Sequence, residues 1–261
     1  MTAPKLSAGE VHVVTGLERL IDDDATIAEM RERITGGDVY IVKGFLDRKR
    51  LEPIREYLTN VGRNSLPNYH PIVPGAPNSH RMNDWDPRAY VAGCFHQFQF
   101  FPWNQDVFNL FTLIRPVYLF KNKLSGLPAE SFLGAEPEDG ITSRLAFQFY
   151  PRGGGGLNMH ADPVDRHQLT VPTMLLSRKG EDYQQGGLVV EKADGSRVDV
   201  DAMMDWGDIL FFNARMAHGV QRVDPEADRD WLSFEGRWMA LFAVNKVAQV
   251  DDIPDAVDLG E

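Results

Sequence analysis

The sequence predicts a mainly β fold with flanking helices, in which a β-sandwich or barrel is backed by helices packed on one sheet. From about Thr142 onward, short apolar segments follow one another with turn residues between them. No helical pattern separates these segments, which is typical of antiparallel sandwiches and barrels. Helical spacing of apolar residues occurs only in the first half. Because no linker of changed composition divides the halves, we expect a single domain over residues 1–261.

The first sixty or so residues predict a helix, a strand and a second helix. Asp22-Asp23-Asp24 can cap a helix over 25–34, which Gly36-Gly37 can end. The apolar run 39–42 is expected to be a short buried strand. Asp47 can cap the second helix, whose apolar residues recur at three- and four-residue spacing. These residues are Leu51, Ile54, Leu58 and Val61.

Residues 64–104 follow no periodic pattern and are expected to be irregular. The segment is too rich in aromatic residues for a disordered linker, and a long irregular segment in a compact domain is usually functional, for example a lid over a substrate. Its polar and aromatic side chains suggest a substrate pocket. They are His70, His80, Arg81, Asn83, Trp85, His96, Gln97, Gln99 and Trp103. A core helix over 105–124, kinked near Pro116, is expected to follow.

The second half supplies the predicted strands. They are expected at 145–150, 169–176, 188–192, 197–200, 209–213, 219–223 and 238–245. We therefore expect residues 142–247 to form the β core. Residues 1–141 would then supply helical support and the irregular segment on the substrate side.

Charge and cysteine content narrow the class of protein. The chain has 27 Lys and Arg against 38 Asp and Glu, a net charge of −11, which opposes a nucleic-acid partner. A single cysteine, Cys94, excludes an intramolecular disulfide and favours a reducing, cytoplasmic compartment. The first ten residues lack the apolar region of a signal peptide, and no apolar run approaches the ~20 residues that span a bilayer. We expect a cytoplasmic protein with a small-molecule substrate and no nucleic-acid or membrane partner. The sequence does not determine its oligomeric state.

Two histidines and one aspartate form the candidate metal centre. In an extended segment residues i and i+2 share a face, so His160 and Asp162 can reach one ion together. A second histidine, His218, begins a predicted strand further on. The tripeptide alone is also common in surface turns, so the prediction depends on His218. Two histidines and one carboxylate on one face of an ion are typical of non-haem Fe(II) oxygenases.

Four motifs in order give the chain a family resemblance. They are Tyr150–Asp162, Gly186-Gly187-Leu188, Gly207-Asp208 ahead of His218, and Gly236-Arg237. Over about residues 144–246 the chain resembles the Fe(II)/2-oxoglutarate-dependent dioxygenases. The resemblance implies a double-stranded β-helix, a distorted jelly roll with helices on one side. It also implies His160, Asp162 and His218 as iron ligands, 2-oxoglutarate as cosubstrate, O2 as oxidant, and hydroxylation of a C–H bond with release of succinate and CO2. No catalytic residue is expected beyond the metal ligands.

The same resemblance implies a set of cosubstrate-binding residues. Arg237 would pair with the far carboxylate of 2-oxoglutarate, since it follows Gly236 at the start of a predicted strand. Nineteen residues separate it from His218, more than is usual in the family, so Arg222 is the alternative. Tyr150, ten residues before His160, and Gln148 on the same strand face are expected to line the cosubstrate pocket. Thr170 could hydrogen-bond the cosubstrate.

Two other functions stay open at this point. One is a cupin-like metal enzyme, an isomerase or a cosubstrate-free dioxygenase, on a similar jelly roll. The other is a non-catalytic binding protein on the same scaffold. A requirement for 2-oxoglutarate separates the first from the predicted oxygenase, and binding of iron separates the second. The substrate, expected to be a small polar or natural-product-like molecule, is not identified by the sequence.

Overall fold

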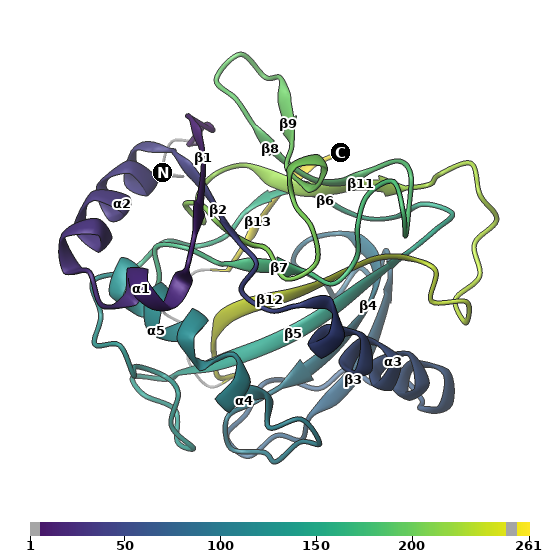
Figure 1. The fold of residues 1–261 in the computed structure, drawn as a ribbon. Helices are drawn as coiled ribbons and strands as arrows, with labels where there is room; N and C mark the ends of the chain where they lie inside the picture. Colours follow the sequence, from purple (N-terminus) through teal and green to yellow (C-terminus); the bar gives the residue numbers. More distant parts are fainter. Residues whose placement is uncertain (1–5, 249–254) are drawn as a thin grey trace.

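The strands form one curled sheet that folds into two facing layers (Figure 1). The computed structural model describes residues 6–248 and 255–261. The larger layer runs in the order β1 (Val11–Thr15), β2 (Val39–Lys43), β10 (Ile209–Phe211), β7 (Thr173–Leu175), β12 (Gly236–Lys246), β5 (Ile141–Pro151) and β4 (Gly93–Phe100). The smaller layer contains β6 (Gly155–Ala161), β11 (His218–Val223), β8 (Gly187–Glu191) and β9 (Arg197–Asp199). β3 (Ser79–Asp84) pairs with β4, and β13 (Val257–Gly260) pairs with β6.

Strand β4 joins the two layers. His96 to Phe100 pair with β5 in the larger layer, whereas Gly93 and Cys94 pair with β6 in the smaller one. These ladders are antiparallel, and among the named strands of the described chain β1 and β2 form the one parallel pair. An antiparallel sheet closed in this way is a double-stranded β-helix, so the predicted fold class is confirmed.

The helices cover the outer face of the larger layer (Figure 1). They are α1 (Leu17–Ile21), α2 (Asp24–Gly36), α3 (Arg48–Asn64), α4 (Leu110–Leu113) and α5 (Arg115–Leu124), with a short 3-10 helix at Asp201–Met203. The predicted caps are present: the side chain of Asp23 accepts a hydrogen bond from the Thr26 amide, and that of Asp47 from the Arg50 amide. The main hydrophobic core lies between helices and sheet, and its members include Ile34, Leu58, Tyr118, Phe147, Phe211 and Trp238. A second core fills the space between the layers.

The prediction of an irregular segment over residues 64–104 is wrong for much of its length. It contains β3 and β4, and every residue of β4 is buried. Polar Gln97 and Gln99 alternate with apolar Phe98 and Phe100 along β4, as expected of a strand between a polar cavity and a hydrophobic layer. Two other expectations also need correction. Residues 105–109 are not helical, and the predicted strand 169–176 is reduced to β7. In the described part of the chain, no helix has both the length and the apolar character needed to cross a bilayer.

Candidate functional site

The three predicted metal ligands meet at one end of the smaller layer. His160 is near the end of β6, Asp162 follows that strand, and His218 begins β11. The antiparallel register sets His218 directly opposite His160, with ring centroids 4.1 Å apart. One donor atom from each of the three residues falls within 4.8 Å of the others. Gly219 permits this approach, because a Cβ there would lie 3.0 Å from backbone atoms of β6.

Hydrogen bonds to the backbone fix which nitrogen each histidine offers. Nδ1 of His160 lies 2.9 Å from the Asn158 carbonyl oxygen, and Nδ1 of His218 lies 2.8 Å from that of Met216. A carbonyl oxygen can only accept, so Nδ1 carries the proton in both rings. Nε2 is therefore the free lone pair in each neutral imidazole, as in most metal-binding histidines. The donor set thus fits a divalent transition metal.

Protonation favours metal binding at neutral pH. Burial, assisted by the neighbouring His218, lowers the pKa of His160 to about 4, so its ring is neutral. For Asp162, burial acts to raise the pKa. The neighbouring His218, whose Nε2 lies 3.5 Å from the carboxylate, and the positive charge of Arg144 outweigh that effect and hold the pKa below its ordinary value. The site therefore presents the Asp162 carboxylate beside the neutral imidazole of His160.

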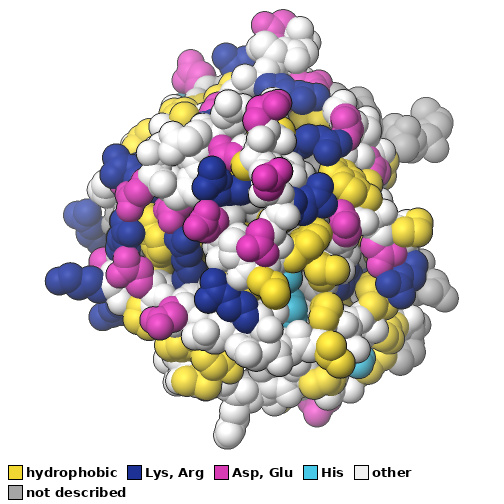
Figure 2. Space-filling model, turned by 90° about the vertical axis from the view of Figure 1, so that its right-hand side faces the viewer, with side chains coloured by type: hydrophobic (Ala, Val, Ile, Leu, Met, Phe, Trp, Pro, Cys, Tyr) yellow, Lys and Arg dark blue, Asp and Glu magenta, His cyan; other side chains and the backbone are white. Residues whose placement is uncertain are grey.

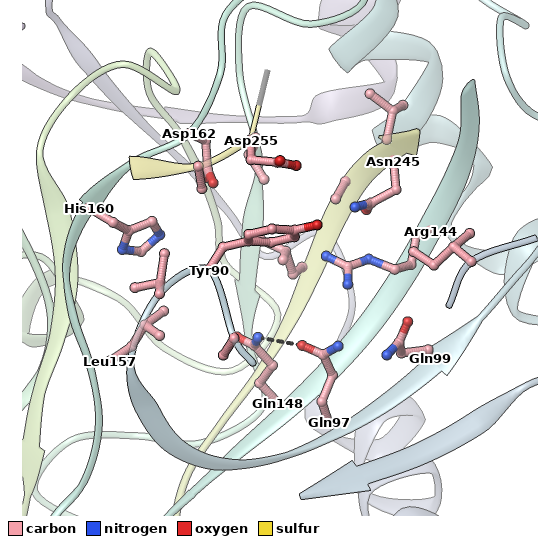
Figure 3. Close-up of a pocket in the computed structure, with 18 of the residues that line it drawn as sticks. Tyr90, Gln97, Gln99, Arg144, Gln148, Leu157, His160, Asp162, Asn245 and Asp255 are labelled. Atoms are coloured by element: carbon pink, nitrogen blue, oxygen red, sulfur yellow. Dashed lines mark hydrogen bonds between the residues drawn. The ribbon is translucent and has the colours of Figure 1, made fainter. Parts of the chain in front are cut away.

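A cavity of about 350 Å³ opens beside the ligands, between the two layers. On the face shown in Figure 2, histidine side chains are visible between hydrophobic ones. Figure 3 shows His160 and Asp162 on one side of the cavity, with Arg144, Asn245, Gln97 and Gln99 on the other. The volume is at the low end of the ~300–1,000 Å³ typical of small-molecule sites.

Two of the expected cosubstrate residues line this cavity. The Tyr150 hydroxyl donates to Oε1 of Gln148 at 2.8 Å, and Nε2 of Gln148 donates to Oε1 of Gln97 at 2.9 Å. The three side chains form a buried polar chain along the wall, and Figure 3 shows its link between Gln148 and Gln97. Thr170 is fully buried, does not line the cavity, and has an Oγ1 without a hydrogen-bond partner.

Arg237 lies behind the ring of Tyr150 and does not line the cavity. Its guanidinium carbon is 5.4 Å from that ring centroid. Its Nε and Nη2 donate to Asp201 at 2.6 and 3.0 Å, in a pair with no exposed side-chain surface. Tyr183 donates to the same carboxylate at 2.5 Å. A Cβ at Gly187, where φ is +109°, would lie 2.4 Å from Asp201, so glycine is needed beside the pair. Only Nη1 of Arg237 lacks a hydrogen-bond partner.

Arg222 is on the outside of the barrel. The ladder between β11 and β6 is irregular after Val220, so Arg222 does not share the face of His218 as its even offset suggests. Its side chain is 46% exposed, pairs with Glu261 and covers the ring of Trp85. It lines a separate surface hollow, away from the metal ligands.

The polar residues expected in a substrate pocket divide into two groups. His70, Arg81, Asn83, Gln97 and Gln99 line the cavity. His80 and His96 instead pack with Phe98 and Phe234, Trp85 lies in the outer hollow, and Trp103 donates to the Ala76 carbonyl. Sequence reasoning missed Arg144, Asn245 and Asp201. Arg144 has even offsets from Gln148 and Tyr150, so a predicted strand begun one residue earlier would have put it on the cavity face.

Comparisons with known proteins support the fold. No protein-family model and no curated protein matches the chain. Thymine 7-hydroxylase from Neurospora crassa, solved with 2-oxoglutarate and thymine, is 12% identical with a TM-score of 0.55, over 94% of this chain and 88% of that one. A prolyl-4-hydroxylase from Pseudomonas putida is 12% identical with a TM-score of 0.51, over 84% and 98%. JOX2, solved with 2-oxoglutarate, iron and JA, is 14% identical with a TM-score of 0.50, over 99% and 80%. The chain therefore has the double-stranded β-helix fold of Fe(II)- and 2-oxoglutarate-dependent oxygenases.

Proposed function

We propose that the protein is a non-haem Fe(II)- and 2-oxoglutarate-dependent oxygenase that hydroxylates a C–H bond of a small molecule. The observation that carries this proposal is the cluster of His160, Asp162 and His218, with both Nδ1 atoms bonded to backbone carbonyls. This set leaves one face of the ion open, as oxygenase chemistry requires. With 2-oxoglutarate and O2, bound Fe(II) supplies an oxidant able to break a C–H bond, and succinate and CO2 are released.

The residues of the protein would bind the iron, orient the ligands on it and exclude water from its open face. His160 and His218 would bind iron through Nε2, and the Asp162 carboxylate lowers the net charge of the site. Apolar side chains along the cavity limit the access of water to the open face, among them Leu157, Leu188, Val220 and Met239. Asp162 is itself anchored, because its amide donates to the Ala214 carbonyl at 2.8 Å.

We propose Arg237, Tyr150 and Gln148 as the residues that hold 2-oxoglutarate. Thr170, the fourth residue expected there, lies three residues before the Thr173–Leu241 pair and so falls at the level of Arg144, away from Arg237. Arg237 Nη1 is a buried polar atom without a hydrogen-bond partner, so it has an unused hydrogen-bonding position. The hydroxyl of Tyr150 and the amide of Gln148 continue this polar surface into the cavity. The far carboxylate of the cosubstrate would approach Nη1 of Arg237 past the ring of Tyr150.

Metal binding and turnover test the proposal. His160→Ala, Asp162→Ala and His218→Ala are each expected to reduce Fe(II) affinity and succinate formation by about 100-fold or more while leaving the fold intact. His12→Ala, which changes a histidine on β1 outside the cavity, is the matched control and should behave as wild type. Equilibrium metal titration and succinate measurement give the two readouts.

Anaerobic addition of 2-oxoglutarate to the Fe(II)-loaded protein separates the alternatives. The oxygenase is expected to show the weak visible charge-transfer band of a chelated 2-oxo acid. A stoichiometrically loaded protein without that band would favour a cosubstrate-free metal enzyme. Failure to bind iron at all would favour a non-catalytic binding protein.

A further inference from the structure

Two arginines line the cavity and have no acidic partner among residues 6–248 and 255–261. Arg144 lies on β5 and Arg81 on β3, and both contribute to the cavity wall. The Nε atom of each is buried without a hydrogen-bond partner. Among the described residues, neither guanidinium takes part in any ion pair. The fully buried Arg237 has Asp201, so the lack of an acidic partner distinguishes these two half-buried side chains from it.

Leaving two like charges together in a cavity is unfavourable. Burial, followed by repulsion from Arg81, lowers the pKa of Arg144 to about 10, and burial also lowers the pKa of Arg81. The chain has eleven more acidic than basic residues, so its composition does not explain why Arg144 and Arg81 lack an acidic neighbour. The acids nearest the cavity are engaged elsewhere. Asp162 belongs to the metal cluster, Asp165 pairs with His167, and Asp255 pairs with Lys246.

The polar groups around the arginines include unused amide donors as well as two unused amide acceptors, Oδ1 of Asn245 and Oε1 of Gln168. Asn83 Nδ2 and Gln97 Nε2 are buried and have no hydrogen-bond partner. Figure 3 shows the guanidinium of Arg144 directed into the cavity between Asn245 and Gln97, with Gln99 beside them. Donors with positive charge and no acceptor are complementary to the oxygens of an anion. The wall is therefore built to receive an anionic group from a ligand.

Arg144 lies at a different level of the barrel from Arg237, the residue proposed to bind the far carboxylate of 2-oxoglutarate. Along the paired strands β5 and β12, Arg237 is opposite Tyr150, whereas Arg144 is opposite Ala243. Six residues separate these two levels, about 20 Å at ~3.3 Å per residue. The two arginines therefore start from different levels of the barrel, and a second anion besides the cosubstrate would satisfy Arg144.

We propose that the substrate is a small carboxylic acid whose carboxylate is held by Arg144 and Arg81, with its reacting carbon turned toward His160, Asp162 and His218. This inference depends on the proposed oxygenase function. The arginines fix the anionic end, and Gln97, Gln99 and Asn83 supply hydrogen bonds along the substrate. Specificity follows, because a neutral analogue would leave both guanidinium groups buried and unpaired.

Binding to a catalytically inert protein tests this assignment directly. The probes are phenylacetate and hexanoate with their primary amides, phenylacetamide and hexanamide. The protein is loaded with Mn(II) and saturating 2-oxoglutarate, and enhanced proton relaxation of each probe reports binding near the metal. The two carboxylates are expected to bind at least ~10-fold more tightly than their amides. Arg144→Gln and Arg81→Gln should abolish this preference, whereas Arg50→Gln, the same change on the exposed surface of α3, should retain it.

Two results would overturn the assignment. The first is that the wild-type protein binds the acids and their amides equally tightly, or that it binds neither carboxylate. The second is an Arg144→Gln protein that loses 2-oxoglutarate itself, which would identify the bound anion as the cosubstrate. Failure of the oxygenase proposal is recognised separately, because the Fe(II) protein would then lack the 2-oxoglutarate charge-transfer band while the carboxylate preference could persist.

Thermal stability separates a binding role from a structural one. If Arg144 is kept for a ligand, its unpaired charge costs stability in the free protein, as is common at functional sites. Arg144→Met is then expected to raise the melting temperature by about 2 °C or more without ligand. A lower melting temperature would indicate that Arg144 supports the fold, and would contradict the proposal.

Discussion

At the scale of single residues, the partners of an arginine decide what it can do. Arg237 and Arg144 both lie on strands that line the interior of the barrel, yet Arg237 already has the carboxylate of Asp201 and Arg144 has none. The charge of Asp201 outweighs burial and raises the pKa of Arg237 above its ordinary value, whereas burial lowers the pKa of Arg144 to about 10. Arg237 is therefore fixed by its ion pair with Asp201, whereas the guanidinium of Arg144 can bind an anionic ligand.

Kinetic measurements can determine whether Arg237 or Arg222 binds 2-oxoglutarate. Arg237→Ala is expected to raise the 2-oxoglutarate requirement by at least ~100-fold, because a charge-assisted hydrogen bond in a buried site is lost. Arg222→Ala should change it by less than ~10-fold, since Arg222 is on the outer surface. Succinate formation against 2-oxoglutarate concentration gives both values.

A second variant of Arg237 controls for folding. Arg237→Ala also leaves Asp201 buried without its cation, which is itself destabilising. Arg237→Lys retains a cation for Asp201 but cannot offer the free Nη1. It should therefore be more stable than Arg237→Ala, although it loses one of the two hydrogen bonds to Asp201, and it should still require much more 2-oxoglutarate. A normal requirement in both Arg237 variants would make this arginine purely structural.

At the scale of elements, the hairpin of β3 and β4 carries two different surfaces. One face of the hairpin supplies Arg81, Gln97 and Gln99 to the cavity. The other face holds a buried histidine pair, in which Nε2 of His80 lies 2.8 Å from Nδ1 of His96. Burial, and then the neighbouring His80, lower the pKa of His96 to about 4. Burial lowers the pKa of His80 as well.

This pair makes the hairpin acid-sensitive. Between pH 6.5 and pH 4 an unfolded histidine binds a proton that folded His96 does not, so stability falls as the pH falls through this window. His96 alone should cost about 2 kcal/mol between pH 6.5 and pH 5. His96→Phe is expected to flatten this dependence in denaturant titrations at several pH values, whereas exposed His70→Phe should not. If the free energy of unfolding of the His96→Phe protein depends on pH as steeply as that of the wild type, groups other than His96 cause the loss of stability in acid.

The same elements show how far the sequence predicts the structure. β8 and β12 could be predicted because apolar residues dominate them, and α2 and α3 because Asp23 and Asp47 give clear caps. β4 could not, because its cavity face carries Gln97 and Gln99 and a strand with a polar interior resembles a loop. The cluster of His160, Asp162 and His218 could be predicted from the His-x-Asp spacing only together with the resemblance to the oxygenase family, which supplied His218. The pairing of Arg237 with Asp201 could not, because 36 residues separate them and only the closed barrel brings them together.

At the scale of the whole molecule, the packing of helix α5 on the larger layer buries an uncompensated charge. Lys121 is completely buried, and its Nζ has no hydrogen-bond partner. Burial lowers its pKa to about 7. The helix layer therefore excludes water from a lysine that would otherwise be charged throughout the physiological range.

Replacement of Lys121 should stabilise the protein. Between pH 7 and pH 10.5 the unfolded lysine binds a proton that the folded one does not, so this group makes stability rise with pH. Lys121→Met is expected to raise the free energy of unfolding at pH 7 by about 2 kcal/mol or more and to reduce the gain between pH 7 and pH 9. Chemical denaturation at both pH values checks this. Destabilisation by Lys121→Met would mean that the ammonium group has a partner after all.

The order in which the strands pair also determines when the protein can form during its synthesis. Val42 on β2 lies opposite Ile209 on β10, 167 positions further along the chain. At ~5–20 residues per second, a ribosome needs roughly ten seconds or more to make that partner. Until β10 has been synthesised, the apolar faces of helices α2 and α3 stay exposed. Nascent chains in such a state depend on chaperones. His218 emerges later still, so iron can be captured only after nearly the whole chain has been translated.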